Sequence, residues 1–207
     1  MTDIELKDII SLRRSLTLLH DKYKVPNVVI SSLPLTRWLI DKLPEATRPP
    51  KLTSEDTGYL LCLCSSTVDL EGDDKGPSVI HAQCVPLLPG YFSGVGDLFS
   101  ALLLGHFQSD APPQGNAPQT LLSYATSMAL TKTHGVLKST YEYTLTLPED
   151  ERQPSDDDKD VAEPIRKLKR MRGRELRLVQ PEGQSIIRGV GSVDTYRMNP
   201  WLEFWNA

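Results

Sequence analysis

Residues 85–105 read Val85-Pro-Leu-Leu-Pro-Gly-Tyr-Phe-Ser-Gly-Val-Gly-Asp-Leu-Phe-Ser-Ala-Leu-Leu-Leu-Gly105, and this stretch is the most informative in the chain. An apolar, proline-marked approach leads into Ser93-Gly-Val-Gly-Asp97, and a helical run starts at Leu98. Two glycines one residue apart allow a tight turn and a close approach of backbone to ligand. The helix that follows directs free N–H groups and the positive end of its dipole at this turn. The pattern therefore predicts an anion site, with phosphate as the first candidate.

The carboxylate of Asp97 would repel a phosphate bound beside it. Its position makes chemical sense if Asp97 accepts a proton rather than holding the anion. A loop, a helix N-terminus and one carboxylate together are the parts of a phosphoryl-transfer site. The residues alone leave an alternative open, namely a glycine-rich turn between strand and helix in which Asp97 is an ordinary N-terminal charge.

The composition is that of a soluble globular protein, with 39% hydrophobic and 24% charged residues among 207. The net charge of −4 argues against a nucleic-acid partner. No apolar run approaches the roughly 20 residues of a membrane span, and the N-terminus lacks a signal-peptide pattern. The three cysteines, Cys62, Cys64 and Cys84, lie in apolar runs and are expected to be reduced core thiols. We expect a cytoplasmic or nuclear location, no membrane contact and no metal site made of protein side chains.

Residues 93–97 are called the glycine loop below, and the residues before this loop predict a helix followed by three strands. Thr2 and Glu5 have capping-box spacing, and apolar residues recur at helical intervals up to about Tyr23. Residues 27–32 form a β-branched run expected to be a buried strand of a parallel sheet. Ser31 and Ser32 would then lie at its C-terminal end, where open α/β sheets gather their ligands. A helix cap or a strand-end hydrogen bond is a competing role for these two serines. The other two strands are expected to form a hairpin, over 58–66 and 78–85.

Beyond the loop, the pattern predicts further helices over 96–108, 119–143 and 166–172, and a final strand over 175–179. The acidic residues 147–163 are expected to be a flexible connection within a domain that spans 1–180. Residues 181–207 form a tail that either docks on the body or is unstructured. The fold class is therefore α/β, mostly a central sheet flanked by helices, with a β-hairpin region and a C-terminal strand.

The segment Ser93-Gly-Val-Gly-Asp-Leu-Phe-Ser-Ala-Leu-Leu-Leu104 resembles the Gly-x-Gly-Asp-Leu-Phe segment of pyridoxal kinases, in the ribokinase-like superfamily. Three other stretches agree with that family in kind and order. They are Leu18–Ser32, which includes Val25-Pro-Asn-Val-Val-Ile-Ser-Ser32, the hairpin Gly58–Val85, and Arg174-Glu-Leu-Arg-Leu-Val-Gln180. The resemblance covers residues 4–180 and implies a partial ribokinase-like fold, of the fungal type.

This resemblance implies an ATP-dependent kinase that phosphorylates the 5′-hydroxymethyl group of pyridoxal, pyridoxine or pyridoxamine in vitamin B6 salvage. It assigns Asp97 as the base that deprotonates this group. It assigns the backbone of Gly94, Val95 and Gly96 as the anion hole for the transferring phosphoryl group. In the family, the position of Val95 is often a threonine, so one hydroxyl that could touch phosphate is replaced here by an apolar side chain.

The same resemblance places Ser31 and Ser32 where family members contact nucleotide phosphate and a monovalent cation. It implies ATP with Mg²⁺ or another divalent cation, a B6 vitamer as substrate, and a homodimer for the full-length form. The family's N-terminal section, which carries the vitamin pocket, would precede Met1, so we expect this chain to be the C-terminal, ATP-binding part. The alternative is a non-catalytic fragment that binds nucleotide or serves as an interaction partner.

Overall fold

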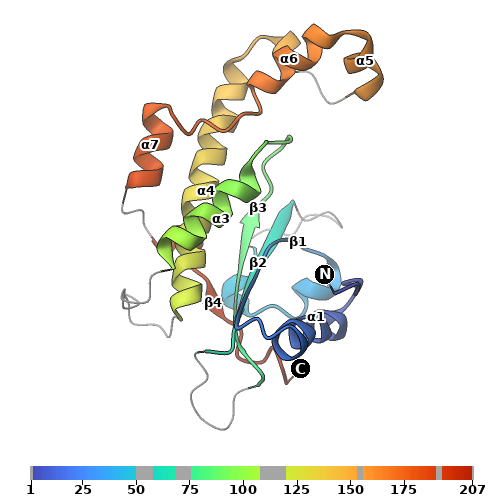
Figure 1. Ribbon diagram of the computed structural model, residues 1–207, viewed down its shortest axis with the longest axis vertical. Coiled ribbons are helices and arrows are strands. Elements are labelled where there is room, and N and C mark those ends of the chain that lie inside the picture. Colours follow the sequence, from blue (N-terminus) through green and yellow to red (C-terminus); the bar gives the residue numbers. More distant parts are fainter. Residues whose placement is uncertain are drawn as a thin grey trace. The chain divides into compact units, whose positions relative to one another are not determined.

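The computed structural model describes residues 2–49, 58–68, 76–107, 120–152, 156–189 and 193–206. The chain divides into two compact units, which are described separately below. The first unit contains Met1–Leu87, His106–Ser127 and Val193–Ala207, and the second contains Leu88–Gly105 and Met128–Ser192. Their helices and strands are labelled in Figure 1.

The first unit is built on a four-stranded antiparallel sheet in the order β1-β2-β3-β4. Its strands are β1 (Asn27–Pro34), β2 (Tyr59–Ser66), β3 (Val79–Pro86) and the short β4 (Asn199–Pro200). The predicted hairpin is confirmed, since β2 and β3 pair antiparallel with Cys62 opposite Gln83. The expectation of a parallel sheet is wrong, because β1 pairs antiparallel with β2 and Val29 lies opposite Cys64. A continuous apolar run signals a buried strand but does not specify the direction of its partner.

Helix α1 (Ile9–Thr17) supplies apolar side chains to the core of the first unit, and a π-helical turn, Leu18–Lys22, continues it. Leu12 and Leu16 are fully buried in the same cluster as Leu61 and Leu63 of β2. The helix does not start at the predicted Thr2–Glu5 capping box. Instead, the Asp8 carboxylate accepts a hydrogen bond of 2.7 Å from the Ser11 backbone N–H, and the Ser11 hydroxyl accepts one from the Asp8 N–H. Two short helical turns, α2 (Arg37–Ile40) and η2 (Glu45–Thr47), follow β1.

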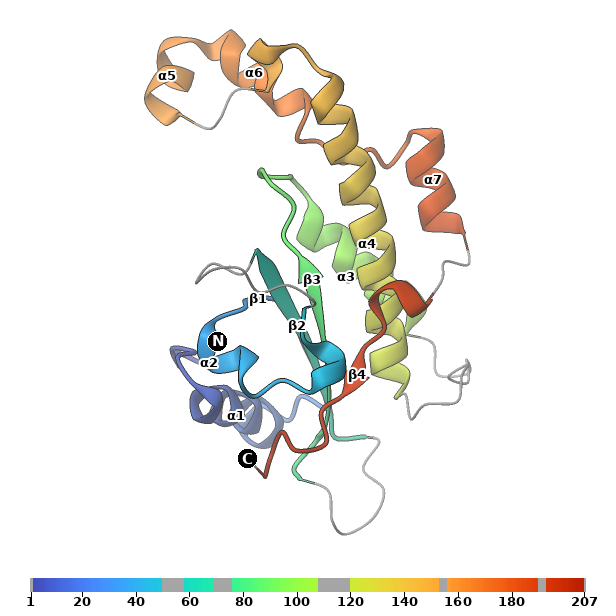
Figure 2. The same cartoon turned by 180° about the vertical axis from the view of Figure 1, so that it is seen from behind.

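The described C-terminal residues 193–206 pack into the first unit. Phe204 is fully buried in the core, and the indole N–H of Trp205 donates a hydrogen bond of 2.8 Å to the Ser78 carbonyl. The Arg13 guanidinium donates a hydrogen bond of 2.6 Å to the Phe204 carbonyl. Figure 2 shows how this segment runs from the turn η4 (Val193–Tyr196) through β4 to the C-terminus.

The second unit is helical. It contains helix α3 (Val95–His106) except its last residue, His106, which belongs to the first unit. Helix α4 (Leu121–Thr146) is divided: residues 121–127 belong to the first unit and residues 128–146 to the second. The turn η3 (Glu149–Glu151) and three short helices complete it: α5 (Asp157–Ala162), α6 (Pro164–Arg172) and α7 (Pro181–Arg188). The predicted helices over 96–108, 119–143 and 166–172 are confirmed in their described parts; Gln108 and Gln119 lie outside the described residues. None of the helices in the described ranges is long and apolar enough to cross a membrane.

The acidic stretch 147–163 contains η3 and α5, and its residues 153–155 lie outside the described ones. Asp156 caps α5 by accepting a hydrogen bond of 3.1 Å from the Lys159 N–H. The predicted C-terminal strand over 175–179 is wrong. Only Glu175 of that segment forms a β-bridge, a parallel one with Ser93. Arg177 of this segment contacts α4 through its backbone N–H and its guanidinium. A local pattern of alternating residues cannot reveal such a contact.

Candidate functional site

The glycine loop leads directly into α3 through a backbone conformation that only glycine adopts readily. Gly94 has φ of +82°, and its carbonyl accepts the first helical hydrogen bond, 3.0 Å from the Leu98 N–H. The first N–H groups of a helix have no partner within it, so those of Val95 and Gly96 are available to a ligand. A Cβ atom placed on Gly96 would meet nothing within 4 Å. The loop therefore leaves an open cradle of backbone N–H donors at the start of α3.

Asp97 lies in the first turn of α3 and is exposed. Asp97 directly follows Gly96 in the sequence. In the described part of the chain, no group of three or more His, Cys, Asp or Glu residues could hold a metal ion.

Segment 173–177 holds the start of the glycine loop in place. The Ser93 N–H donates a hydrogen bond of 3.0 Å to the Arg174 carbonyl, beside the Ser93–Glu175 bridge. The Thr144 hydroxyl of α4 donates one of 2.7 Å to the Gly173 carbonyl. These contacts join the loop to α4 through one short segment of chain, within the second unit.

A second threonine of α4 completes this attachment. The Thr140 hydroxyl accepts a hydrogen bond of 3.2 Å from the Arg177 N–H, and the Arg177 guanidinium lies 4.1 Å from the ring centroid of Tyr143. Sequence reasoning missed these positioning residues. The signal that could have found them is the four-residue spacing of Thr140 and Thr144, which puts both hydroxyls on one face of α4.

Ser31 and Ser32 lie within β1 rather than at its end, because the strand continues to Pro34. The register of β1 against β2 shifts between Ile30 and Leu33, so the two serines occupy an irregularity in the strand. Their hydroxyl oxygens are 3.2 Å apart, with Ser31 half-buried and Ser32 exposed. They belong to the first unit, whereas Gly94–Asp97 belong to the second. Gly94, Val95, Gly96 and Asp97 thus lie together at the start of α3 in the second unit, whereas Ser31 and Ser32 belong to the first unit.

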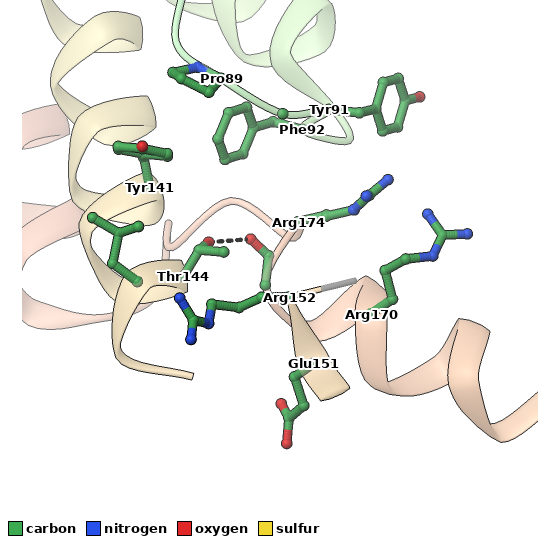
Figure 3. A pocket seen from close by; sticks show the side chains of 12 residues that line it. Pro89, Tyr91, Phe92, Tyr141, Thr144, Glu151, Arg152, Arg170 and Arg174 are labelled. Carbon is green, nitrogen blue, oxygen red and sulfur yellow. Dashed lines mark hydrogen bonds between the residues drawn. The ribbon is translucent and has the colours of Figure 1, made fainter. Parts of the chain in front are cut away.

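A pocket of about 300 Å³ opens in the second unit just before the glycine loop (Figure 3). Residues 89–92 of the approach line one side. The other sides are lined by residues near the end of α4 and by Glu151, Arg152, Arg170, Gly173 and Arg174. Thr144 of α4 also lines the pocket and donates its hydrogen bond to the Gly173 carbonyl. The approach to the glycine loop therefore forms one wall of a ligand-sized cavity.

Comparison with known proteins points to one class of enzyme. No family model matches the chain. A Schizosaccharomyces pombe protein named as a pyridoxal kinase is 28% identical over 191 residues, which are 87% of this chain and 46% of that protein. A second protein from the same yeast, with the same description, is 28% identical over 141 residues, or 66% of this chain and 37% of that protein.

Solved structures of pyridoxal kinases share the fold. The Leishmania donovani enzyme in complex with ADP has a TM-score of 0.54 at 18% identity, with 96% of this chain and 46% of that one covered. The Trypanosoma brucei enzyme has a TM-score of 0.53 at 16% identity, with coverages of 96% and 47%. This chain is therefore distantly related to pyridoxal kinases, and it spans about half the length of the relatives it matches.

Proposed function

We propose that this chain carries the ATP-phosphate side and the catalytic base of a pyridoxal kinase. The observation that carries the proposal is the geometry at the start of α3. Gly94 turns the chain in the left-handed conformation, Gly96 leaves space over the helix N-terminus, and Asp97 stands in the first turn. The distant relationship to pyridoxal kinases supports the same reaction class.

In this reaction the 5′-hydroxymethyl oxygen of the vitamin attacks the γ-phosphorus of ATP. The bond from that phosphorus to the β–γ bridging oxygen breaks, ADP leaves, and the hydroxyl proton passes to the Asp97 carboxylate. The backbone N–H groups of Val95 and Gly96 hold the oxygens of the transferring group, on which negative charge is spread. Because the Val95 side chain has no hydroxyl, the backbone N–H groups alone stabilise the negative charge of the transferring phosphoryl group at this loop.

Binding of ATP would bring Mg²⁺ or another divalent cation, whose charge neutralises the phosphates during transfer. The substrate is a B6 vitamer: pyridoxal, pyridoxine or pyridoxamine. We assign Ser31 and Ser32 to contacts with nucleotide phosphate or a monovalent cation, on the strength of the resemblance to pyridoxal kinases. For the full-length form we propose a homodimer in the cytoplasm or nucleus.

A second function, of another class, is a non-catalytic nucleotide-binding or interaction protein. The observation that favours it is the extent of the match, because the chain corresponds to 46% of the first relative. Both functions use the glycine loop to bind phosphate. They differ in whether a hydroxyl group is brought to Asp97.

The test is an assay of the purified chain of 207 residues with ATP, Mg²⁺ and pyridoxal, in which pyridoxal 5′-phosphate is quantified by chromatography. ADP affinity is measured in parallel by calorimetry. Sustained product formation supports the kinase and removes the second function. ADP binding with no product above the protein-free background supports the second function instead. If the chain neither binds ADP nor forms product, the assignment of the loop is wrong.

A further inference from the structure

We propose that the pocket before the glycine loop binds an organic phosphate, a phosphate monoester carried on a planar heteroaromatic ring, at a site separate from Gly94–Gly96. Aromatic and proline side chains of residues 89–92 form one wall of the pocket, and guanidinium groups form the opposite wall (Figure 3). An aromatic wall facing a cationic wall fits a flat ligand that carries a negative charge. All the lining residues belong to the second unit.

The cationic wall consists of Arg152, Arg170 and Arg174. Guanidinium groups stay charged at all physiological pH values and match the oxygens of phosphate two at a time. Burial, followed by the charge of neighbouring Arg170, lowers the pKa of Arg174 below its ordinary value. A phosphate dianion in the pocket would lie among these positive charges, in a partly desolvated space where the attraction is stronger than in water.

Asp160 holds part of this wall rigid. One of its carboxylate oxygens accepts a hydrogen bond from Arg170 and the other accepts one from Arg166. The side chains of Asp160 and Arg170 are only 5% and 6% exposed. Glu151 also lines the pocket, but its carboxylate points away from the three arginines in Figure 3 and accepts a hydrogen bond of 3.4 Å from Arg172. Asp160 thus fixes the Arg170 guanidinium and offsets its charge, so Arg152 and Arg174 are the groups that would bind the anion.

The aromatic wall indicates the rest of the ligand. Tyr91 is 64% exposed although it is a large aromatic side chain, and Phe92 is half-buried beside it. A heteroaromatic ring placed between these rings and the arginines would gain both aromatic stacking and cation–π contact. The volume of about 300 Å³ lies at the lower end for ligand pockets, so it suits one ring with one phosphate rather than a nucleoside triphosphate.

The probe is pyridoxine 5′-phosphate, which has the ring and the phosphate but no aldehyde to react with lysines. Its affinity is measured by calorimetry on the full chain. We expect Arg174→Gln and Arg152→Gln each to weaken binding about tenfold or more, because each removes a charged hydrogen-bond donor. Arg188→Gln, at the exposed end of α7, is the matched control and should leave affinity unchanged. Pyridoxine without its phosphate should bind at least tenfold more weakly than the probe.

Gly96→Ala separates this site from the glycine loop. The substitution should leave binding of the probe within twofold of the unsubstituted chain, whatever it does to ADP. Circular dichroism checks that each variant is folded, and Tyr91→Ala offers a second test of the same pocket at an exposed position. Three results would overturn the proposal: no binding of the probe, equal affinity in both arginine variants and Arg188→Gln, or loss of binding in Gly96→Ala alone.

Discussion

The backbone N–H of Ser93 donates a hydrogen bond of 3.0 Å to the carbonyl oxygen of Arg174, which lies 81 positions further along the chain. This bond fixes the residue immediately before Gly94, where the proposed anion hole begins. Segment 173–177 is in turn held by Thr140 and Thr144 of α4. The shape of the glycine loop therefore depends on side chains of α4, which lie outside the loop itself.

Thr144→Val should lower stability by about 1 kcal/mol, because the Gly173 carbonyl loses the hydroxyl that binds it. For a chain of this size that corresponds to a fall in Tm of about 2–4 °C. Thr146→Val is the control, since the exposed Thr146 hydroxyl donates its hydrogen bond to a carbonyl of its own helix, that of Tyr143. Thermal unfolding followed by circular dichroism makes the comparison. Equal Tm values for the two variants would show that the Thr144–Gly173 bond does not hold the segment.

Gly94→Ala should weaken ADP binding, because alanine in the left-handed region costs about 1–2 kcal/mol and the loop would relax away from its shape. Gly58→Ala is a matched control, with φ of +60°, nothing within 4 Å of the added Cβ, and a position in the first unit. Both variants should lose similar stability, but only Gly94→Ala should lose ADP affinity, by about tenfold in calorimetry. An equal effect of the two on ADP affinity would argue against a role for the loop in binding.

Gly96→Ala should act differently from Gly94→Ala, because position 96 needs no left-handed backbone and its Cβ would enter open space. We expect Tm to stay within about 1 °C of the unsubstituted chain while ADP affinity falls, since the methyl group fills part of the cradle that phosphate would occupy. Unchanged ADP affinity together with unchanged Tm would show that phosphate does not lie over Gly96.

Much of the second unit could be predicted from sequence, since the relevant signals are local. Glycine spacing and the apolar run after Asp97 predict α3, which begins at Val95. The basic run predicts α6. The attachment of residues 173–177 could not be predicted, because it depends on contacts with α4 some 30 residues away in sequence, through hydroxyls that look like ordinary helix surface.

The first unit shows the same limit. An apolar run predicts β1, although only Val28 and Leu33 of this strand are buried. Its antiparallel pairing with β2 depends on residues about 30 positions away in the sequence. Thr2 and Glu5 have the spacing of a capping box, but Asp8 and Ser11 form one closer to the buried face of α1, where Leu12 and Leu16 anchor the helix. The helix therefore starts at Asp8, although Asp8 and Ser11 lack the Ser/Thr-x-x-Glu/Gln pattern that Thr2 and Glu5 have.

Asp8 should make stability depend on pH on the acid side. Its hydrogen bond from the Ser11 backbone N–H, and then that from the Ser11 side chain, lower the pKa of Asp8 below its ordinary value of 3.8. The folded state therefore favours the ionised carboxylate. This difference adds to the free energy of unfolding. Its contribution is complete above the pKa of Asp8 in the unfolded chain, and it is lost as the pH falls through the lower pKa of Asp8 in the folded chain.

Asp8→Asn, which keeps a capping oxygen but has no charge to titrate, should flatten the loss of Tm below about pH 4. Asp21→Asn, an exposed acid of the π-helical turn, is the comparison. Urea or thermal unfolding at intervals from pH 2 to pH 7 makes the measurement. A profile for Asp8→Asn as steep as that of Asp21→Asn would show that this cap does not couple folding to protonation.

The cysteines should resist modification while the chain is folded. Burial raises the pKa of Cys84 to about 12 and that of Cys62 well above its ordinary value, and Cys64 is also buried. Since the thiolate is the reactive form, a disulfide reagent such as DTNB at pH 8 should react at the rate of unfolding, and at once in urea. Rapid reaction of one or more thiols in the native chain would contradict this burial.

The measurement that tests the central claim most directly compares pyridoxal phosphorylation by the unsubstituted chain, Asp97→Asn and Glu182→Gln. Glu182 is the control because it is also an exposed carboxylate in the first turn of a helix, α7. We predict that Asp97→Asn lowers kcat by about 10²–10⁴-fold, as expected for loss of a general base, with ADP affinity retained and Glu182→Gln near normal. A kcat in Asp97→Asn equal to that of Glu182→Gln would contradict the assignment of Asp97 as the base.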